Sequence, residues 1–225
     1  MSSKITRVVA VVNRKGGVGK STLNILLAGA LARDKRKKVC ILDCDAQRSV
    51  ADLLEIESGA NDGEPLVPVF SLAPMFVLDW LKSFGSSYDV IFIDAPRITE
   101  DKTDTALGQL LALCDTVLIP VLGSTVDALS TRYFLRLVES MEEHKKELGV
   151  PFQYAGFINR FTSRKDNEHA ADFMDKIGLP MFVEPVKDLK IFSSPSLYAS
   201  ILDTTEGERR FRPFLNEFYK TFKIK

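Results

Sequence analysis

Short apolar runs that alternate with helix-like segments are the feature that most constrains the fold of this chain. The runs are RVVAVVN, KVCILDCD, YDVIFIDAP, DTVLIPVL, FQYAGFIN and PMFVEPV. They are almost continuously apolar, which is typical of parallel strands covered on both faces. The segments between them carry apolar residues at helical spacing, for example Leu23, Leu26, Leu27, Ala30 and Leu31, and later Leu129, Tyr133, Leu137 and Met141. The alternation predicts a doubly wound α/β fold, in which a mostly parallel sheet has helices on both faces.

Length and composition predict one domain over residues 1–225, located in the cytoplasm. A chain of 225 residues with 45% hydrophobic content can bury a substantial core, and no stretch reads as a linker. Thirty basic residues balance thirty acidic ones, which argues against a protein that coats nucleic acid. Cys40, Cys44 and Cys114 form no C-x-x-C pair, so we expect reduced, buried thiols instead of a disulfide framework or a zinc site. The residues before the first run lack the apolar region of a signal peptide, so we expect none, and no run is long enough to span a membrane.

The stretch NRKGGVGKST, residues 13–22, nearly matches the phosphate-loop pattern G-x-x-x-x-G-K-[ST], with Arg14 in place of the first glycine. It leaves an apolar run and enters a helical pattern, which is the context a nucleotide loop requires. Lys20 would reach the β- and γ-phosphates, and the Ser21 hydroxyl would ligate Mg²⁺. The residues that let backbone N–H groups approach the phosphates are Gly16, Gly17 and Gly19. The stretch therefore predicts nucleotide binding.

Three carboxylates follow two of the apolar runs and could serve a magnesium ion. VIFID ends at Asp94, which is the Walker B pattern, and LDCDAQ places Asp43 and Asp45 two residues apart. Carboxylates hold Mg²⁺ directly or through its waters, so Asp43 and Asp94 are candidate metal ligands. Asp45 would orient the water that attacks the γ-phosphate. For Asp43 and Asp45 the alternative is a helix N-cap or a turn acid, although Gln47 after them favours function.

These stretches resemble the deviant Walker A ATPases of the ParA/MinD family, which are P-loop NTPases. The family's loop reads K-G-G-x-G-K-[ST]-T and its second motif reads D-x-D-x-Q; this chain has KGGVGKST and DCDAQ. YDVIFIDAP and LCDTVLIPVLGSTVDALS are similar to two further family segments, whereas the last forty or so residues match only loosely. The resemblance implies ATP and Mg²⁺ as cofactors and an ATP-dependent homodimer. It also implies that Lys15 reaches across the dimer interface to the other subunit's ATP and neutralises developing negative charge.

The resemblance carries particular roles onto this chain, residue by residue. It assigns hydrolysis to Lys15, Lys20 and Asp45. It places Asn159, in FINR, where the family has an asparagine that reads adenine; a turn-forming asparagine is the alternative. In DAPR, Arg97 stands where the family has a second proline. Its side chain could face phosphate, a partner protein or solvent, and the sequence does not decide among them. The implied nucleotide-binding residues are Lys15, Gly16, Gly17, Val18, Gly19, Lys20, Ser21, Thr22 and Asn159, and the implied metal-binding residues are Ser21, Asp43 and Asp94.

Members of the family differ in the surface to which the ATP-bound dimer attaches. ParA-type proteins bind DNA through basic patches, and residues 187–225 carry eight basic against five acidic residues, although a solvated helix face gives the same count. MinD binds membrane through a C-terminal amphipathic helix, and RPFLNEFYKTFKIK has apolar residues at helical spacing with lysines beside them. Pro213 suits the first position of a helix, and the aromatic stripe favours packing on the core instead.

The interpretation that these features favour is a ParA-like partition ATPase. Its dimer would bind DNA non-specifically, lie on the nucleoid in the ATP-bound form, and segregate a plasmid, a chromosome or another cargo. A ParB-like or other adaptor protein would stimulate hydrolysis and release. The chain begins a few residues before its first apolar run, so we expect no N-terminal helix-turn-helix domain. The alternatives are a MinD-like membrane-associated positioning ATPase and a small-molecule ATP-dependent enzyme on the same scaffold.

Overall fold

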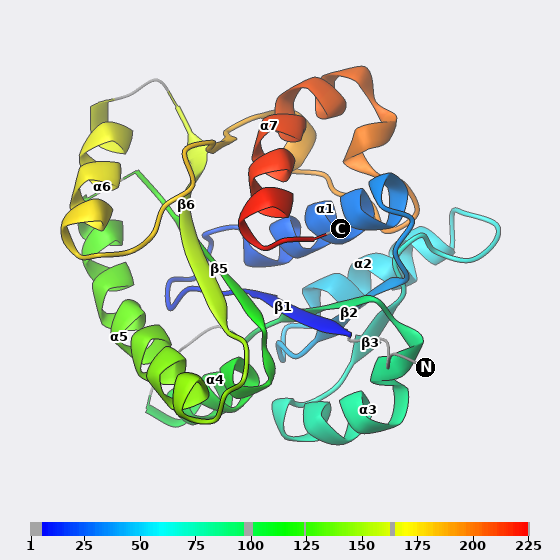
Figure 1. The fold of residues 1–225 in the computed structure, drawn as a ribbon. Helices are drawn as coiled ribbons and strands as arrows, with labels where there is room; N and C mark the ends of the chain where they lie inside the picture. Colours follow the sequence, from blue (N-terminus) through cyan, green and yellow to red (C-terminus); the bar gives the residue numbers. More distant parts are fainter. Residues whose placement is uncertain (1–5, 97–100, 124, 163–164, 225) are drawn as a thin grey trace.

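One parallel sheet of seven strands, in the order β3-β2-β4-β1-β5-β6-β7, runs through the part of the chain that the structure describes (Figure 1). The structure is a computed structural model that describes residues 6–96, 101–123, 125–162 and 165–224. The strands are β1 (Arg7–Val11), β2 (Val39–Asp43), β3 (Val69–Ser71), β4 (Val90–Asp94), β5 (Thr116–Val121), β6 (Gln153–Phe161) and β7 (Val186–Lys187). The strand order reverses around β1, which is where doubly wound sheets place their ligands. The predicted α/β fold is confirmed.

Helices cover both faces of the sheet, with α1, α2 and α7 on one face and α3 to α6 on the other (Figure 1). The helices are α1 (Lys20–Asp34), α2 (Ser49–Ser58), α3 (Val77–Phe84), α4 (Asp101–Leu113), α5 (Thr125–Glu147), α6 (Lys165–Lys176) and α7 (Thr205–Thr221), with short 3-10 turns η1 (Pro74–Phe76), η2 (Gly85–Ser87), η3 (Lys190–Phe192) and η4 (Ile201–Asp203). Successive strand residues point to opposite faces. Val9 and Val11 accordingly join the core under α1 and α7, whereas Val8 and Ala10 join the core under α4 and α5. Burial on both faces explains why the runs are continuously apolar.

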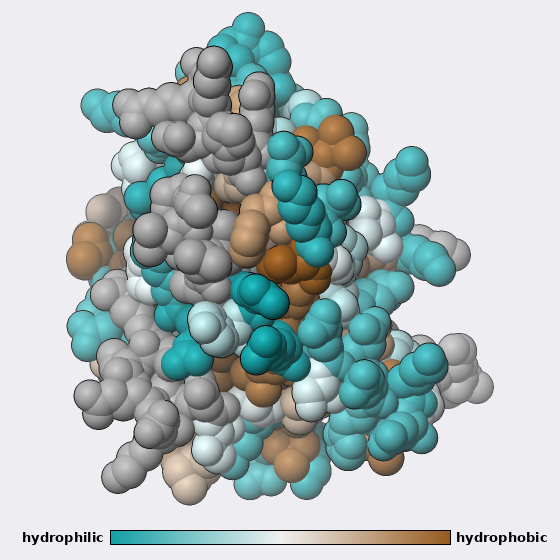
Figure 2. Space-filling model, turned by 90° about the vertical axis from the view of Figure 1, so that its left-hand side faces the viewer, coloured by the Kyte–Doolittle hydropathy of each residue, from teal (hydrophilic) through white to brown (hydrophobic). Residues whose placement is uncertain are grey.

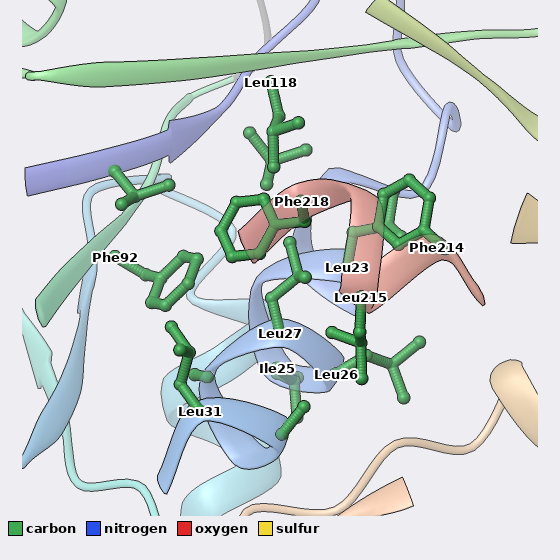
Figure 3. Packing of buried hydrophobic residues seen from close by; sticks show 14 of the residues in the cluster. Leu23, Ile25, Leu26, Leu27, Leu31, Phe92, Leu118, Phe214, Leu215 and Phe218 are labelled. Carbon is green, nitrogen blue, oxygen red and sulfur yellow. The ribbon is translucent and has the colours of Figure 1, made fainter. Parts of the chain in front are cut away.

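Helix α7 packs its aromatic stripe against α1 and the sheet. Phe214, Leu215 and Phe218 lie in one cluster with Leu23 and Leu27 of α1 (Figure 3), and each of the five is at most 1% exposed. Core packing, which was the favoured interpretation of this segment, is confirmed. A membrane anchor would need the same stripe at the surface. Among the described residues, no helix is long and apolar enough to cross a bilayer.

Two details of the sheet differ from the sequence prediction. Strand β3 was missed, because its three residues are too few for a pattern to emerge. The run PMFVEPV forms a ladder only at its end, from Val186, together with an isolated bridge between Met181 and Gly156. Pro180 and Pro185 lack the N–H group that a continuous strand would donate, which explains the interruption.

The three cysteines are free and buried in the core, as predicted. Burial raises the pKa of the Cys40 thiol to about 12. Burial, with the nearby carboxylates Asp43 and Asp94, raises the pKa of Cys44 to about 12 as well. Thiols with such pKa values stay protonated at neutral pH and pack as small apolar side chains.

Candidate functional site

The candidate site lies at the carboxyl edge of the sheet, where β1, β2, β4 and β6 end. This edge is at the left of Figure 1, and Figure 2 faces it, with hydrophilic residues gathered in the middle of that face. The register places Asp43 of β2 beside Asp94 of β4, and Asp94 beside Val11 of β1. Parallel pairing therefore brings both acids next to the loop that follows β1.

The loop between β1 and α1 has the backbone of a phosphate cradle. Gly17 and Gly19 have φ values of 76° and 90°, a left-handed conformation that suits glycine. A Cβ atom on Gly19 would lie 2.6 Å from Asn159 Nδ2, so a side chain has no room there. Helix α1 begins at Lys20 without a side-chain cap or an acid in its first turn, which leaves its first N–H groups for an anion. These features fit the phosphates of a nucleotide.

Two lysines lie at this loop in different settings. Lys20 is 7% exposed, and its Nζ donates to the backbone oxygen of Lys15 at 3.3 Å. Lys15 is half-buried at the start of the loop, and its backbone N–H donates to Asn13 Oδ1 at 3.1 Å. The ammonium group of Lys20 can leave the Lys15 oxygen for phosphate oxygens, with which it makes stronger, charge-assisted hydrogen bonds.

Asp94 is held by two side chains of α1. Ser21 Oγ donates to Asp94 Oδ2 at 2.7 Å, and Asn24 Nδ2 donates to Asp94 Oδ1 at 2.8 Å. Burial, and to a lesser extent the nearby Asp43, raises the pKa of Asp94 to about 6 despite these two donors. A hydroxyl and a carboxylate in contact beside a phosphate cradle are oxygen donors of the kind that Mg²⁺ takes. The residues present therefore fit a magnesium ion.

We expect Asp94→Asn to stabilise the nucleotide-free protein at neutral pH. The folded protein raises the pKa of Asp94 from an ordinary 3.8 to about 6, so it holds this proton more tightly than the unfolded chain does. The contribution of Asp94 to stability therefore falls as pH rises from about 4 to about 6 and is constant above, a loss on the order of 3 kcal/mol. Urea unfolding of both proteins at about pH 4 and about pH 7.5 measures it. A stability difference between them that is the same at both pH values would contradict the assignment.

Asp43 and Asp45 both bind backbone N–H groups. Asp43 Oδ2 accepts from the N–H groups of Val50 and Ala51, both at 3.0 Å, in the first turn of α2. Asp45 Oδ1 accepts from the N–H of Gln47 at 2.9 Å. Asp45 thus acts as the turn acid of the structural alternative, whereas Asp43 binds the first turn of α2 although the N-cap position is held by Arg48. A role of either acid toward metal or water would be additional. The described residues contain no group of three or more metal-ligating side chains, so a bound Mg²⁺ would depend strongly on phosphate oxygens.

A cavity of about 340 Å³ opens beside the loop, between the start of α1 and the segment from β6 to η3. Asn159 lies in its wall, and its Nδ2 donates to the backbone oxygen of Val18 at 2.7 Å. Thr22 lines the same cavity. The volume falls in the range of small-ligand sites. The amide of Asn159 retains a second N–H and its oxygen for a base edge, so adenine recognition stays a prediction.

Two asparagines carry contacts that the sequence did not signal. Asn24 is fully buried, and its Oδ1 accepts no hydrogen bond from the described residues. Asn13 is 3% exposed and contacts both the loop and the end of β5. The one sequence signal for a buried role of Asn24 is that it is a polar residue among the leucines of α1. Arg97, whose role the sequence left open, lies outside the described residues.

Comparison with known proteins identifies relatives over most of the chain. Residues 9–196 match the family model described as the CobQ/CobB/MinD/ParA nucleotide binding domain. The chain is 25% identical over 194 residues to the maintenance of carboxysome distribution protein A of Halothiobacillus neapolitanus, covering 85% of this chain and 84% of that protein. It is 30% identical over 137 residues to the protein ParA of Rhizobium radiobacter, covering 60% of this chain and 58% of that protein.

Three solved structures share the fold. An ATP complex of McdA from Cyanothece has a TM-score of 0.72 at 19% identity, covering 100% of this chain and 98% of that one. The MinC:MinD cell division complex of Aquifex aeolicus has a TM-score of 0.68 at 18% identity, with 94% and 96% covered. Cobyrinic acid a,c-diamide synthase of Mycobacterium smegmatis, bound to an ATP analogue and magnesium, has a TM-score of 0.69 at 18% identity, with 98% and 96% covered.

Proposed function

The chain belongs to the CobQ/CobB/MinD/ParA nucleotide-binding domain family and is a ParA/MinD-type ATPase, and from this we propose that it is a partition ATPase that positions a cargo along DNA. Residues 1–225 would act as one ATPase domain. ATP binding would join two copies face to face, the dimer would bind DNA non-specifically, and hydrolysis would release it. The observation that carries the proposal is Lys15 at the start of the phosphate loop, with its backbone held by Asn13 and Lys20.

The residues of the loop and the strand ends have distinct tasks in this proposal. The glycines and the first N–H groups of α1 bind the phosphates, and Lys20 Nζ exchanges the Lys15 oxygen for a phosphate oxygen. The Ser21 hydroxyl donates its hydrogen bond to Asp94, so the lone pairs of its oxygen would be left for Mg²⁺. Mg²⁺, when bound, supplies positive charge that neutralises the phosphate oxygens. Asp45 orients the attacking water.

The basic residues near the C-terminus fall into two groups that differ in their suitability for DNA. Arg212 is engaged by Glu208 at 2.7 Å and by Asp34 at 2.6 Å, and these carboxylates raise its pKa further. Arg210 lies 4.0 Å from Glu206. Cations neutralised within the protein release few counterions on binding, so we assign DNA contact to the second group. Its exposed members are Lys187, Lys190, Arg209, Lys220 and Lys223.

The ATP-loaded protein is expected to bind random-sequence duplex DNA with an affinity that falls steeply as salt rises. Arg209→Glu and Lys190→Glu should each weaken binding and lower the slope of log affinity against log salt by about one per lost phosphate contact. Fluorescence anisotropy across a salt series measures both quantities. Lys146→Glu, an exposed lysine in the last turn of α5 on the opposite face of the sheet, is the matched control. An equal loss in that variant would refute the assigned surface.

Anionic liposomes in the same salt series test the MinD-like alternative. Liposome binding without DNA binding would replace the partition proposal with that alternative. The buried stripe of α7 argues against it, because those side chains already stabilise the core. A small-molecule enzyme on the same scaffold would bind neither DNA nor liposomes and would hydrolyse ATP in step with an organic substrate.

The names of two relatives support an adaptor that links the ATPase to its cargo. One relative is named for carboxysome distribution, and another was solved as a MinC:MinD complex. We therefore propose that a ParB-like or other small adaptor protein stimulates hydrolysis by this chain. The protein would be cytoplasmic and lie on the nucleoid while ATP is bound.

A further inference from the structure

Asn13 links the phosphate loop to the elements beside it through three hydrogen bonds. Its Nδ2 donates to the backbone oxygen of Pro120 at 2.8 Å and to Thr131 Oγ1 at 3.2 Å. Its Oδ1 accepts from the backbone N–H of Lys15 at 3.1 Å. Asn13 is 3% exposed and Thr131 is fully buried, so these bonds are shielded from water. Such buried bonds hold a side chain in one orientation.

The bond to Pro120 continues the pairing of β1 with β5 beyond the point where the backbones part. The last backbone bond between these segments runs from the N–H of Val12 to the oxygen of Leu118. One residue further, the chain turns into the phosphate loop, and the side chain of Asn13 reaches Pro120 in place of a backbone group. The start of the loop is therefore fixed to β5 and, through Thr131, to α5.

Lys15 is held on both sides of its backbone, and only one of the two contacts is expected to survive nucleotide binding. Its N–H is bound by Asn13, and its carbonyl oxygen accepts from Lys20 Nζ. In the proposed function Lys20 turns to the phosphates and leaves that oxygen. The bond to Asn13 does not involve Lys20 and can persist.

We propose that Asn13 is a positioning residue for Lys15: it sets the direction in which this lysine leaves the loop and couples that direction to α5 through Thr131. The inference rests on the proposed function, in which Lys15 acts on the other subunit's nucleotide. Asn13 touches neither phosphate nor metal in this role. It precedes in the sequence the glycines and Lys20, which would bind the phosphates of their own subunit.

Because Asn13 precedes the phosphate-binding residues, its loss should affect dimerisation much more than the affinity of the monomer for nucleotide. Asn13→Ala should weaken ATP-dependent dimerisation about tenfold or more, because it releases the backbone of Lys15 and two anchoring bonds. The affinity of the monomer for a fluorescent ATP analogue should change by less than about threefold. Dimerisation is measured by analytical ultracentrifugation with a non-hydrolysable ATP analogue. The affinity of the monomer is measured by titrating the fluorescent analogue at protein concentrations too low for the dimer to form.

Thr131 supplies a matched pair that avoids the loop altogether. Thr131→Val removes the hydroxyl but keeps the shape, and it should weaken dimerisation in the same direction as Asn13→Ala by about threefold. Thr131→Ser keeps the hydroxyl and should dimerise like the wild type. This pair also keeps the inference testable if Asn13→Ala fails to fold. Equal behaviour of Thr131→Val and Thr131→Ser would overturn the coupling to α5.

The remaining outcomes separate this inference from the function on which it rests. If Asn13→Ala loses analogue affinity as much as dimerisation, Asn13 shapes the cradle and does not position Lys15, and the inference falls. If Lys15→Ala fails to dimerise but Asn13→Ala dimerises normally, the inference falls and the proposed function stands. If Lys15→Ala itself dimerises normally, the proposed trans lysine is wrong.

Discussion

Lys15→Ala is expected to yield a monomer that binds ATP but no longer forms the ATP-dependent dimer. Two nucleotides packed face to face concentrate negative charge, and a lysine from the opposite subunit offsets it. Lys15 stands at the start of the loop, before the glycines and before Lys20, so its loss should spare the cradle of its own subunit. Ultracentrifugation with a non-hydrolysable ATP analogue, together with analogue binding to the monomer, measures the two effects.

Arg14→Ala is the matched control, because it removes an exposed cation from the neighbouring position of the same loop. It should dimerise like the wild type. If both variants lose the dimer equally, general positive charge at the loop is responsible and Lys15 has no special role. A dimer of wild-type stability in Lys15→Ala would remove the main support for an ATP-gated pair.

The positions of the candidate phosphate loop and of the two strand-end acids could be predicted because their signals are local. The glycines and Lys20 define a backbone shape and a charge within a few residues, and Asp43 and Asp94 each end an apolar run. The contacts of Asn13 and Asn24 could not be predicted in this way. Asn13 reaches Pro120, 107 residues along the chain, and its partner depends on the sheet order that puts β5 beside β1.

In helix α5, too, the local sequence did not predict which side chains are buried. The spacing of apolar residues predicted a helix that includes Tyr133, and a helix is present. The helical pattern counted Tyr133 among its apolar residues, but Tyr133 is 65% exposed, whereas Phe134 and Val138, outside that pattern, are buried. Tyrosine suits either a core or a wet surface, so the pattern did not specify which of two adjacent rows faces the sheet.

The basic residues near the C-terminus also differ in ways that a count of charges does not show. In the sequence, Arg212 and Arg209 count equally toward a basic patch. In the structure, Arg212 joins α7 to Asp34 at the end of α1, whereas Arg209 is exposed. Acidic partners far apart in the chain decide which cations are left for the proposed contact with DNA, so the sequence alone could not indicate that surface.

Asp45→Asn and Asp45→Ala are both expected to slow ATP hydrolysis by a factor on the order of 10² to 10⁴, which is the usual contribution of a general base. ATP binding does not require that carboxylate, so both variants should accumulate the ATP-bound dimer. Asp45 is half-buried and lies two residues beyond the end of β2, at the edge that carries Asp94 and the phosphate loop. Phosphate release under saturating ATP measures turnover, and ultracentrifugation measures the trapped dimer.

The pair of substitutions separates the two roles that the structure leaves to Asp45. An asparagine can still accept the N–H of Gln47 and keep the turn, whereas an alanine loses the turn and the charge together. If the carboxylate acts on water, both variants are slow; if Asp45 only stabilises the turn, Asp45→Asn works like the wild type and Asp45→Ala does not. Asp52→Asn, an exposed acid of α2 that lies 3.6 Å from Arg48, serves as the control and should leave turnover unchanged. Wild-type turnover in Asp45→Asn would therefore assign this carboxylate to the fold and leave the attacking water to another group.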